Sequence, residues 1–191
     1  VQGDSRRKIS GTSRLEIKER RRQTRFVFSR WKDGETERRN RLKIKDILNI
    51  TNGKLISGNQ ELECESFSKD TRTIQRGDIY IGIKGENFDG SKFWKQAIDN
   101  GADAVIIENT DIPKNELEKY SNKVILEVEN TLEALYKIAK YKREQYNIPV
   151  IAVTGSVGKT STKDLIASVV GRKYKTLKTE GNNNNNIGLP L

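Results

Sequence analysis

The sequence predicts an α/β protein in which a small mixed α/β domain is followed by the start of a doubly wound, phosphate-binding domain. Short β-branched runs alternate with amphipathic segments along most of the chain, and this alternation is typical of α/β folds. A continuous apolar run leads into a glycine-containing loop and a helical pattern, as in doubly wound domains that bind phosphate. These patterns divide the chain into residues 1–41, a basic extension, residues 42–146, the first domain, and residues 147–191, the first β-loop-α-β unit of the second.

Composition places the chain among globular proteins without a membrane span. Its 191 residues, 34% of them hydrophobic, suffice for one ordinary domain or two small ones. The apolar stretch at 150–153 is far too short to cross a bilayer and no secretory signal is visible, so we expect no membrane insertion. Cys64 is the only cysteine and cannot form an internal disulfide, which fits a cytoplasmic location. With one Cys and no His, a zinc site is not expected.

The basic charge of the chain is concentrated in residues 1–41. This segment holds 14 of the 36 Lys and Arg but only 6 of the 26 acids, so it carries +8 of the total charge of +10. Nucleic-acid binding is therefore an interpretation of the extension alone, and the nearly neutral remainder is not expected to bind nucleic acid. We expect the extension to be disordered or weakly helical.

A second interpretation, which we favour, is that residues 1–41 are no part of the natural protein. The chain contains no Met, and recognisable structure begins at Leu42. A bacterial start codon can be one that ordinarily encodes Leu, and the codons of Arg38 and Arg39 can spell a purine-rich ribosome-binding sequence. The hypothesis is that the extension is an untranslated leader read in frame.

The first domain is predicted to contain alternating helices and strands. Ile44, Ile47 and Leu48 recur at helical spacing, and their helix ends near Asn52. The run Asp78–Lys84 is β-branched and aromatic and is bounded by glycines, which is typical of a strand. The predicted strands are 54–56, 62–67, 78–84, 104–108 and 123–128, and the predicted helices are 44–52, 91–100 and 131–146. The side chains assigned to the core without a functional role are Cys64, Phe93 and Trp94.

The second unit begins with the apolar run Ile148–Thr154, a pattern found in buried parallel strands. A loop follows, then a helix predicted for Lys159–Val170 and a strand for Tyr174–Leu177. Backbone N–H groups at the start of a helix lack an intrahelical partner, so the turn before Lys159 favours a phosphate anion. The residues predicted to bind phosphate are Gly155, Ser156, Val157, Gly158, Lys159, Thr160 and Ser161.

This loop has the spacing G-x-x-G-K-T, whereas the full phosphate-loop pattern would place a further glycine at Val153. Gly155 and Gly158 allow a positive φ and a close approach of the backbone to a ligand. Lys159 supplies a positive charge for β- and γ-phosphates, and the Thr160 hydroxyl suits Mg²⁺. The pattern alone does not separate ATP from GTP, and it leaves a small kinase as an alternative.

Three separated motifs resemble the Mur ligases, which add amino acids to the peptidoglycan precursor. The loop T-G-S-V-G-K-T-S-T-K-D is similar to the family's nucleotide loop. A second stretch is similar to the family's N-terminal domain, which holds the uridine diphosphate end of the substrate. It runs from Asp70-Thr71-Arg72 through K-G-E-N-F-D-G to Asn100-Gly101-Ala102. Residues 181–190 (GNNNNNIGLP) resemble the G-N-x-N-N-x-I-G-x-P segment of F-type members. The resemblance covers residues 42–191.

The resemblance implies an ATP-dependent amide ligase that joins D-alanyl-D-alanine to UDP-N-acetylmuramoyl-tripeptide through an acyl phosphate. Residues 42–146 would bind the UDP-muramyl peptide and residues 147–191 would begin the ATP-binding domain. The cofactors implied are ATP and Mg²⁺, with Lys159 as the catalytic residue and Thr160 as the metal ligand. The residues implied to bind substrate are Thr71, Arg72, Asn182 and Asn185. We expect a monomer that is inactive alone, because the family's later segments lie beyond Leu191.

Other interpretations of the same motifs remain open. An E-type Mur ligase, which adds the third amino acid, shares the stretch that begins at Asp70. The run of asparagines can be a polar low-complexity loop, and Asp70-Thr71-Arg72 can be an exposed turn with a local hydrogen bond. A nucleic-acid-binding module that uses residues 1–41 predicts steeply salt-dependent binding.

Overall fold

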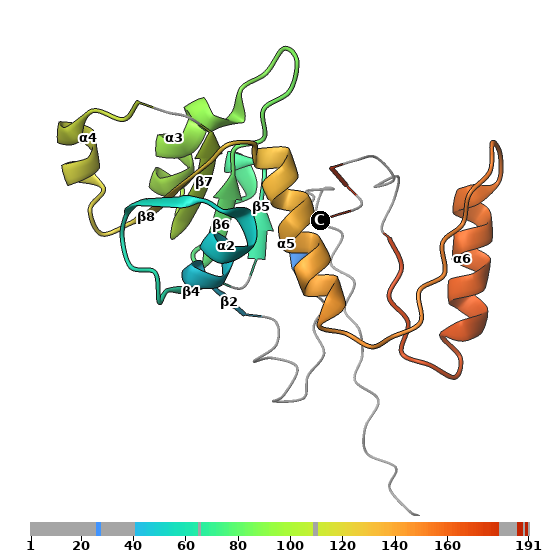
Figure 1. The fold of residues 1–191 in the computed structure, drawn as a ribbon. Coiled ribbons are helices and arrows are strands. Elements are labelled where there is room, and N and C mark those ends of the chain that lie inside the picture. The colour runs from blue at the N-terminus through green and yellow to red at the C-terminus, as the bar shows by residue number, and fades with distance from the viewer. Residues whose placement is uncertain are drawn as a thin grey trace, which may run out of the picture.

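A six-stranded sheet, in the order β1-β5-β6-β7-β8-β3, forms the centre of the part of the chain that the structure describes (Figure 1). This structure is a computed structural model, and it describes residues 26–27, 41–64, 66–108, 111–179, 187–188 and 190. The strands are β1 (Phe26–Val27), β3 (Lys54–Ser57), β5 (Ser66–Ser68), β6 (Asp78–Ile81), β7 (Ala104–Glu108) and β8 (Val124–Val128). Strands β5 to β8 are parallel, whereas β1 and β3 run antiparallel to the strands beside them.

Helices connect the strands and flank the sheet. They are α2 (Ile44–Thr51), α3 (Trp94–Asp99), α4 (Lys114–Lys119) and α5 (Thr131–Glu144), with the 3₁₀ turns η1 (Thr71–Thr73) and η2 (Gly90–Phe93). Helix α6 (Lys159–Val170) follows them in the chain. Two short strands, β2 (Leu42–Lys43) and β4 (Glu63–Cys64), pair antiparallel in a second, small sheet.

Both faces of the main sheet are buried, because alternate residues of its parallel strands point to opposite sides. The cluster on the face of α2 and α5 contains Ile79, Ile81, Ala104, Ile106, Val124 and Leu126 from the strands and Ile44, Ile47, Leu135 and Ile138 from the helices. The cluster on the face of α3 contains Tyr80, Val105, Ile107 and Ile125 from the strands and Trp94, Ala97, Ile98 and Tyr120 from the connections. The result is a three-layer domain, and its mixed α/β class is the one that the sequence predicted.

Most predicted elements of the first domain are confirmed, although the bounds of all but one differ from the prediction. The predicted strand 104–108 is β7, with both bounds as predicted. The predicted helix 131–146 is α5, which ends at Glu144. The predicted strand 62–67 is two strands, because β4 pairs with β2 whereas β5 joins the main sheet beside β6. The predicted helix 91–100 begins instead as η2 and becomes α-helical only at Trp94. Strand 78–84 ends at Ile81, since the backbone then turns through Gly82 towards Gly90.

The predicted strands of the second unit do not form, whereas its helix does. Helix α6 has the predicted bounds, but 148–154 and 174–177 contain no strand. A strand is stabilised by hydrogen bonds to a neighbouring strand, and in the described ranges no strand lies beside these two segments. Ile148, Val150 and Ile151 therefore stay exposed instead of entering a sheet.

One part of the basic extension also departs from the prediction of disorder or weak helix. Phe26 and Val27 form β1, which pairs with Phe67 and Ser66 of β5. This pairing occupies an edge of β5 that would otherwise present unpaired N–H and C=O groups, and aromatic and β-branched residues favour strands. The other residues of 1–40 lie outside the described residues.

Among the side chains assigned to the core, Trp94 and Cys64 are buried, as expected. Phe93 was assigned wrongly: it is 40% exposed and stacks on Phe88, with ring centroids 5.4 Å apart. Phe93 lies in the η2 turn, one residue before α3, so the helical periodicity that buries Trp94 does not extend to it. No described helix is long and apolar enough to span a bilayer.

Candidate functional site

Polar side chains gather where the four parallel strands end. Because β5 to β8 are parallel, their carboxyl ends meet at one edge of the sheet, which is where ligands bind in open α/β sheets. Lys69 to Arg72 follow β5, Lys84 follows β6, Glu108 ends β7 and Thr131 follows β8. We call this set the carboxyl edge.

The loop from Gly82 to Gly90 is shaped by a close approach of its two ends. A Cβ added at Gly90 would lie 2.6 Å from the carbonyl oxygen of Ile83, and one added at Gly82 would lie 2.8 Å from the Cα of Ser91. The hydroxyl of Tyr80 donates to the carbonyl of Gly90 at 2.9 Å from within the core. The K-G-E-N-F-D-G motif is therefore a hairpin-like loop whose base only glycines can form.

Glu108 joins three elements at the carboxyl edge. Its Oε1 accepts from the backbone N–H of Thr131 at 2.7 Å and from the Thr131 hydroxyl at 2.9 Å. Its Oε2 lies 3.8 Å from the Lys84 ammonium, and its own N–H donates to the Ser91 hydroxyl at 2.9 Å. The carboxylate thus satisfies a free N–H in the first turn of α5 and ties that helix to the Gly82–Gly90 loop.

Thr71 and Arg72, both predicted substrate residues, lie in the η1 turn directly after β5. Asp70 accepts from the Arg72 backbone N–H at 3.0 Å and from its Nε and Nη2 at 2.9 and 2.6 Å. The hydrogen bond from the Arg72 side chain lowers the pKa of Asp70 below its ordinary value and raises that of Arg72. The Thr71 carbonyl accepts from Asn100 at 2.8 Å. The motif is therefore an ordered turn with an internal ion pair.

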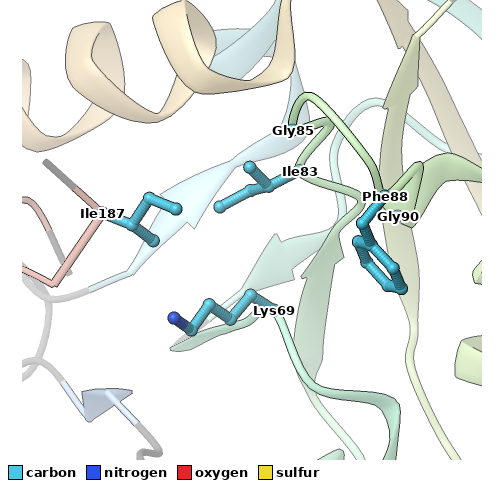
Figure 2. Close-up of a pocket in the computed structure, with 6 residues that line it drawn as sticks. All are labelled: Lys69, Ile83, Gly85, Phe88, Gly90 and Ile187. Atoms are coloured by element: carbon cyan, nitrogen blue, oxygen red, sulfur yellow. The ribbon is translucent and has the colours of Figure 1, made fainter.

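A cavity of about 240 Å³ opens between the end of β5 and the Gly82–Gly90 loop (Figure 2). It is lined by Lys69, Ile83, Gly85, Phe88, Gly90 and Ile187. Ile187 belongs to the predicted asparagine-rich segment, although Asn182 and Asn185 themselves lie outside the described residues. Figure 2 shows Ile187 facing Ile83, so Ile187 reaches the first domain at the cavity.

The predicted phosphate loop leads into α6 as expected. Gly155 and Gly158 have positive φ values of 147° and 80°, and Gly158 is the residue before the helix, with no side-chain cap. The first intrahelical bond runs from the N–H of Thr162 to the carbonyl of Gly158, so the N–H groups of the first turn are available to an anion. The Lys159 ammonium donates to the carbonyl of Gly155 at 2.5 Å, within the loop that a phosphate would enter.

These residues fit a nucleotide phosphate with its magnesium ion. A side-chain cap would have occupied the start of α6, and none is present. Thr160 is exposed on the first turn, so its hydroxyl can serve as one magnesium ligand. The described ranges contain no cluster of three or more Asp, Glu, Cys or His that could hold a metal ion.

The predicted site residues fall into two groups in space. Thr71 and Arg72 lie at the carboxyl edge, whereas the phosphate loop lies with α6, which stands apart from the sheet and buries none of its residues (Figure 1). Lys69 and Glu108 were not predicted as site residues from the sequence. Their place directly after β5 and at the end of β7 was the signal that could have found them, because side chains at these positions share the carboxyl edge.

Comparison with known proteins connects both groups to one family. The family description "Mur ligase family, catalytic domain" matches residues 66–143, and "Mur ligase middle domain" matches residues 153–191. The chain belongs to the Mur ligase family. The two matches cover the carboxyl edge and the phosphate loop, in the order in which the chain carries them, and they confirm the resemblance drawn from the sequence motifs.

Related Mur ligases agree in name and fold. UDP-N-acetylmuramoyl-tripeptide–D-alanyl-D-alanine ligase from Bacillus subtilis is 38% identical over 149 residues, which are 78% of this chain and 32% of the relative. The Escherichia coli protein of that name is 32% identical, over 78% of this chain and 30% of its own length. A structure of such a ligase from Acinetobacter baumannii has a TM-score of 0.68 at 32% identity, with 78% of this chain and 32% of that one covered.

MurF ligase from Thermotoga maritima, whose structure is a complex with ADP, has a TM-score of 0.55 at 34% identity, with 65% of this chain and 27% of that one covered. The chain thus spans about one third of the length of the relatives that it matches.

Proposed function

We propose that this chain provides the substrate-binding domain and the ATP phosphate loop of an ATP-dependent amide ligase, which joins D-alanyl-D-alanine to UDP-N-acetylmuramoyl-tripeptide. The observation that carries the proposal is the phosphate loop before α6, in a chain whose curated relatives bear the name of this ligase. These names favour the F type over the E-type alternative. A cytoplasmic location belongs to the same proposal, because one substrate is a nucleotide-linked precursor. The monomeric state stays a prediction from the sequence.

In the proposed reaction, the terminal carboxylate of the tripeptide attacks the γ-phosphorus of ATP. The bond between that phosphorus and the bridging oxygen breaks, which releases ADP and leaves an acyl phosphate. The amine of D-alanyl-D-alanine then attacks the acyl carbon, loses a proton and displaces inorganic phosphate. The amide product and one phosphate account for all atoms transferred.

The residues of the loop would act on the charge that develops during phosphoryl transfer. The first-turn N–H groups of α6 would bind the phosphates, and the Lys159 ammonium would exchange the Gly155 carbonyl for phosphoryl oxygens. Mg²⁺ held at Thr160 would neutralise phosphate charge and orient the γ-phosphoryl group. Gly155, Ser156, Val157, Gly158 and Ser161 would shape the cradle around it. Thr71 and Arg72 at the carboxyl edge, together with Asn182 and Asn185, are the residues that the family resemblance implies as contacts of the nucleotide-linked substrate.

Binding is the first test, because the chain spans about one third of its relatives. Calorimetric titration of the whole chain with ATP and Mg²⁺ is expected to show one site, and Lys159→Ala is expected to weaken it at least ~10-fold through loss of a charge-assisted contact. Lys173→Ala, which removes an exposed lysine beyond α6, is the matched control. Equal affinities of the two variants for ATP would refute the role of Lys159.

A further inference from the structure

The cations at the carboxyl edge differ in how far they are already engaged. Arg72 places both Nε and Nη2 on Asp70, so the pair is close to neutral. Lys84 has its ammonium 3.8 Å from Glu108, which also occupies the start of α5. For Lys69, an exposed residue, the described part of the chain provides no hydrogen bond or ion pair.

Lys69 also lines the cavity, which neither Arg72 nor Lys84 does. The other cavity side chains are apolar: Ile83 and Ile187 on one side and Phe88 towards the other (Figure 2). Phe88 is 59% exposed even though one face of its ring stacks on Phe93. An apolar-walled cavity with one uncompensated cation suits a ligand that joins a flat, weakly polar ring to an anionic group.

Arg72 has a different role in this geometry. Asp70 accepts the backbone N–H of Arg72, so it caps the η1 turn and fixes the direction of the chain just after Lys69. The guanidinium holds the Asp70 carboxylate in place from the solvent side, since the Arg72 side chain is 80% exposed. An Asp70 carboxylate without this partner would place a net negative charge one residue from Lys69.

We propose that Lys69 is the residue that contacts the diphosphate of a nucleoside diphosphate at this cavity, and that Arg72 is a positioning residue that neutralises Asp70. The inference rests on the proposed function, since it assigns the nucleotide end of that substrate to named residues. It replaces the direct substrate contact that the family resemblance implies for Arg72 with an indirect role, and it assigns the diphosphate contact to Lys69. Lys69 comes before the D-T-R motif and is not part of it.

The test compares UDP and uridine as probes of the whole chain by calorimetric titration. Lys69→Gln is expected to weaken UDP binding roughly tenfold and to leave uridine binding unchanged, because only the contact to the charged group is lost. Arg72→Gln is expected to weaken UDP binding by less than about threefold, as for an exposed ion pair. Lys119→Gln removes an exposed lysine at the end of α4, before β8 begins, and is the matched control. Circular dichroism of each variant verifies that its fold persists.

The outcomes separate the inference from the proposed function. If UDP binds and Lys69→Gln loses no more affinity than Lys119→Gln, the assignment of Lys69 is overturned while the proposed function stands. A loss in Arg72→Gln as large as that in Lys69→Gln overturns the division of roles between the two residues. If the unaltered chain binds neither UDP nor uridine at millimolar concentration, both the inference and the proposed substrate domain are wrong.

Discussion

Substitution of Gly90 by Ala tests how the loop at the carboxyl edge is held. The added Cβ would lie 2.6 Å from the carbonyl oxygen of Ile83 and 2.8 Å from the carbonyl carbon of Gly82. All of these are backbone atoms, so no flexible side chain can move aside. Gly85 lies in the same loop, yet a Cβ there meets its nearest atom, the carbonyl oxygen of Phe88, only at 3.8 Å. Gly85→Ala is therefore the matched control.

The expected cost follows from these distances. Normal contacts of this kind lie near ~3.5 Å, so the two strands of the loop must separate by roughly 1 Å, an overpacking that costs about 1–3 kcal/mol. The same shift lengthens the buried bond from the Tyr80 hydroxyl to the carbonyl of Gly90, which adds about 1 kcal/mol. We expect Gly90→Ala to lower the free energy of unfolding by about 3 kcal/mol. Gly85→Ala should change it by about 0.5 kcal/mol at most.

Urea unfolding of the whole chain measures both variants. Far-UV circular dichroism reports the helices. Fluorescence reports both tryptophans of the chain, of which Trp94 is buried between α3 and the sheet. Both substitutions reduce the freedom of the unfolded chain equally, so their difference isolates the clash. If Gly90→Ala unfolds within about 0.5 kcal/mol of Gly85→Ala at an unchanged slope, the close approach of the backbones is not a constraint.

Three further predictions concern the rest of the first domain. Burial lowers the pKa of Lys142 to about 8, so above that pH the unfolded chain binds more protons than the folded chain. The free energy of unfolding should therefore rise by about 1 kcal/mol from pH 7.5 to 9. Lys142→Met should abolish this rise in urea titrations, and a rise that persists in the variant would exclude Lys142 as its cause. Asn130 caps α5, because its side chain accepts the N–H of Glu133 at 2.8 Å. Asn130→Ala should therefore lower the free energy of unfolding by about 1 kcal/mol. Glu129→Ala, the control, should lower it by about 0.5 kcal/mol or less. Burial raises the pKa of the Cys64 thiol to about 12, so an aromatic disulfide reagent at pH 8 should label it only as fast as the domain opens, and rapid labelling of the folded chain would contradict its burial.

The sequence predicted best those elements whose signals are local. The strand Ala104–Glu108 was placed at both ends, since a short β-branched run between polar residues has one arrangement in a parallel sheet. Helix α6 was also placed at both ends, because the glycine loop marks its start. The prediction of a strand at Ile148–Thr154 was wrong for the opposite reason. An apolar run can form a strand only if a partner strand from another part of the chain lies beside it.

The candidate site was predictable only in part. The phosphate loop is contiguous in sequence, so its residues could be named in advance. The carboxyl edge assembles Lys69, Lys84, Glu108 and Thr131 from four different strand ends, and no spacing rule connects them. Helix α4 was missed because its residues Lys114–Lys119 are mostly charged, although Pro113 before them was a usable start signal.

The carboxylate of Glu108 at the start of α5 has a consequence for the two phosphorylated ligands of the proposed function. The N–H of Thr131 donates to Glu108 and that of Glu133 donates to Asn130. The Glu108 carboxylate is thus the anion of this helix terminus, which cannot attract a second one. A diphosphate at the carboxyl edge must rely on exposed lysines, whose attraction falls with ionic strength over a Debye length of about 8 Å in physiological salt. The loop before α6 instead offers fixed N–H groups that bind at contact distance. Added salt should therefore release a nucleotide sugar from the first domain well before it releases ATP from the second.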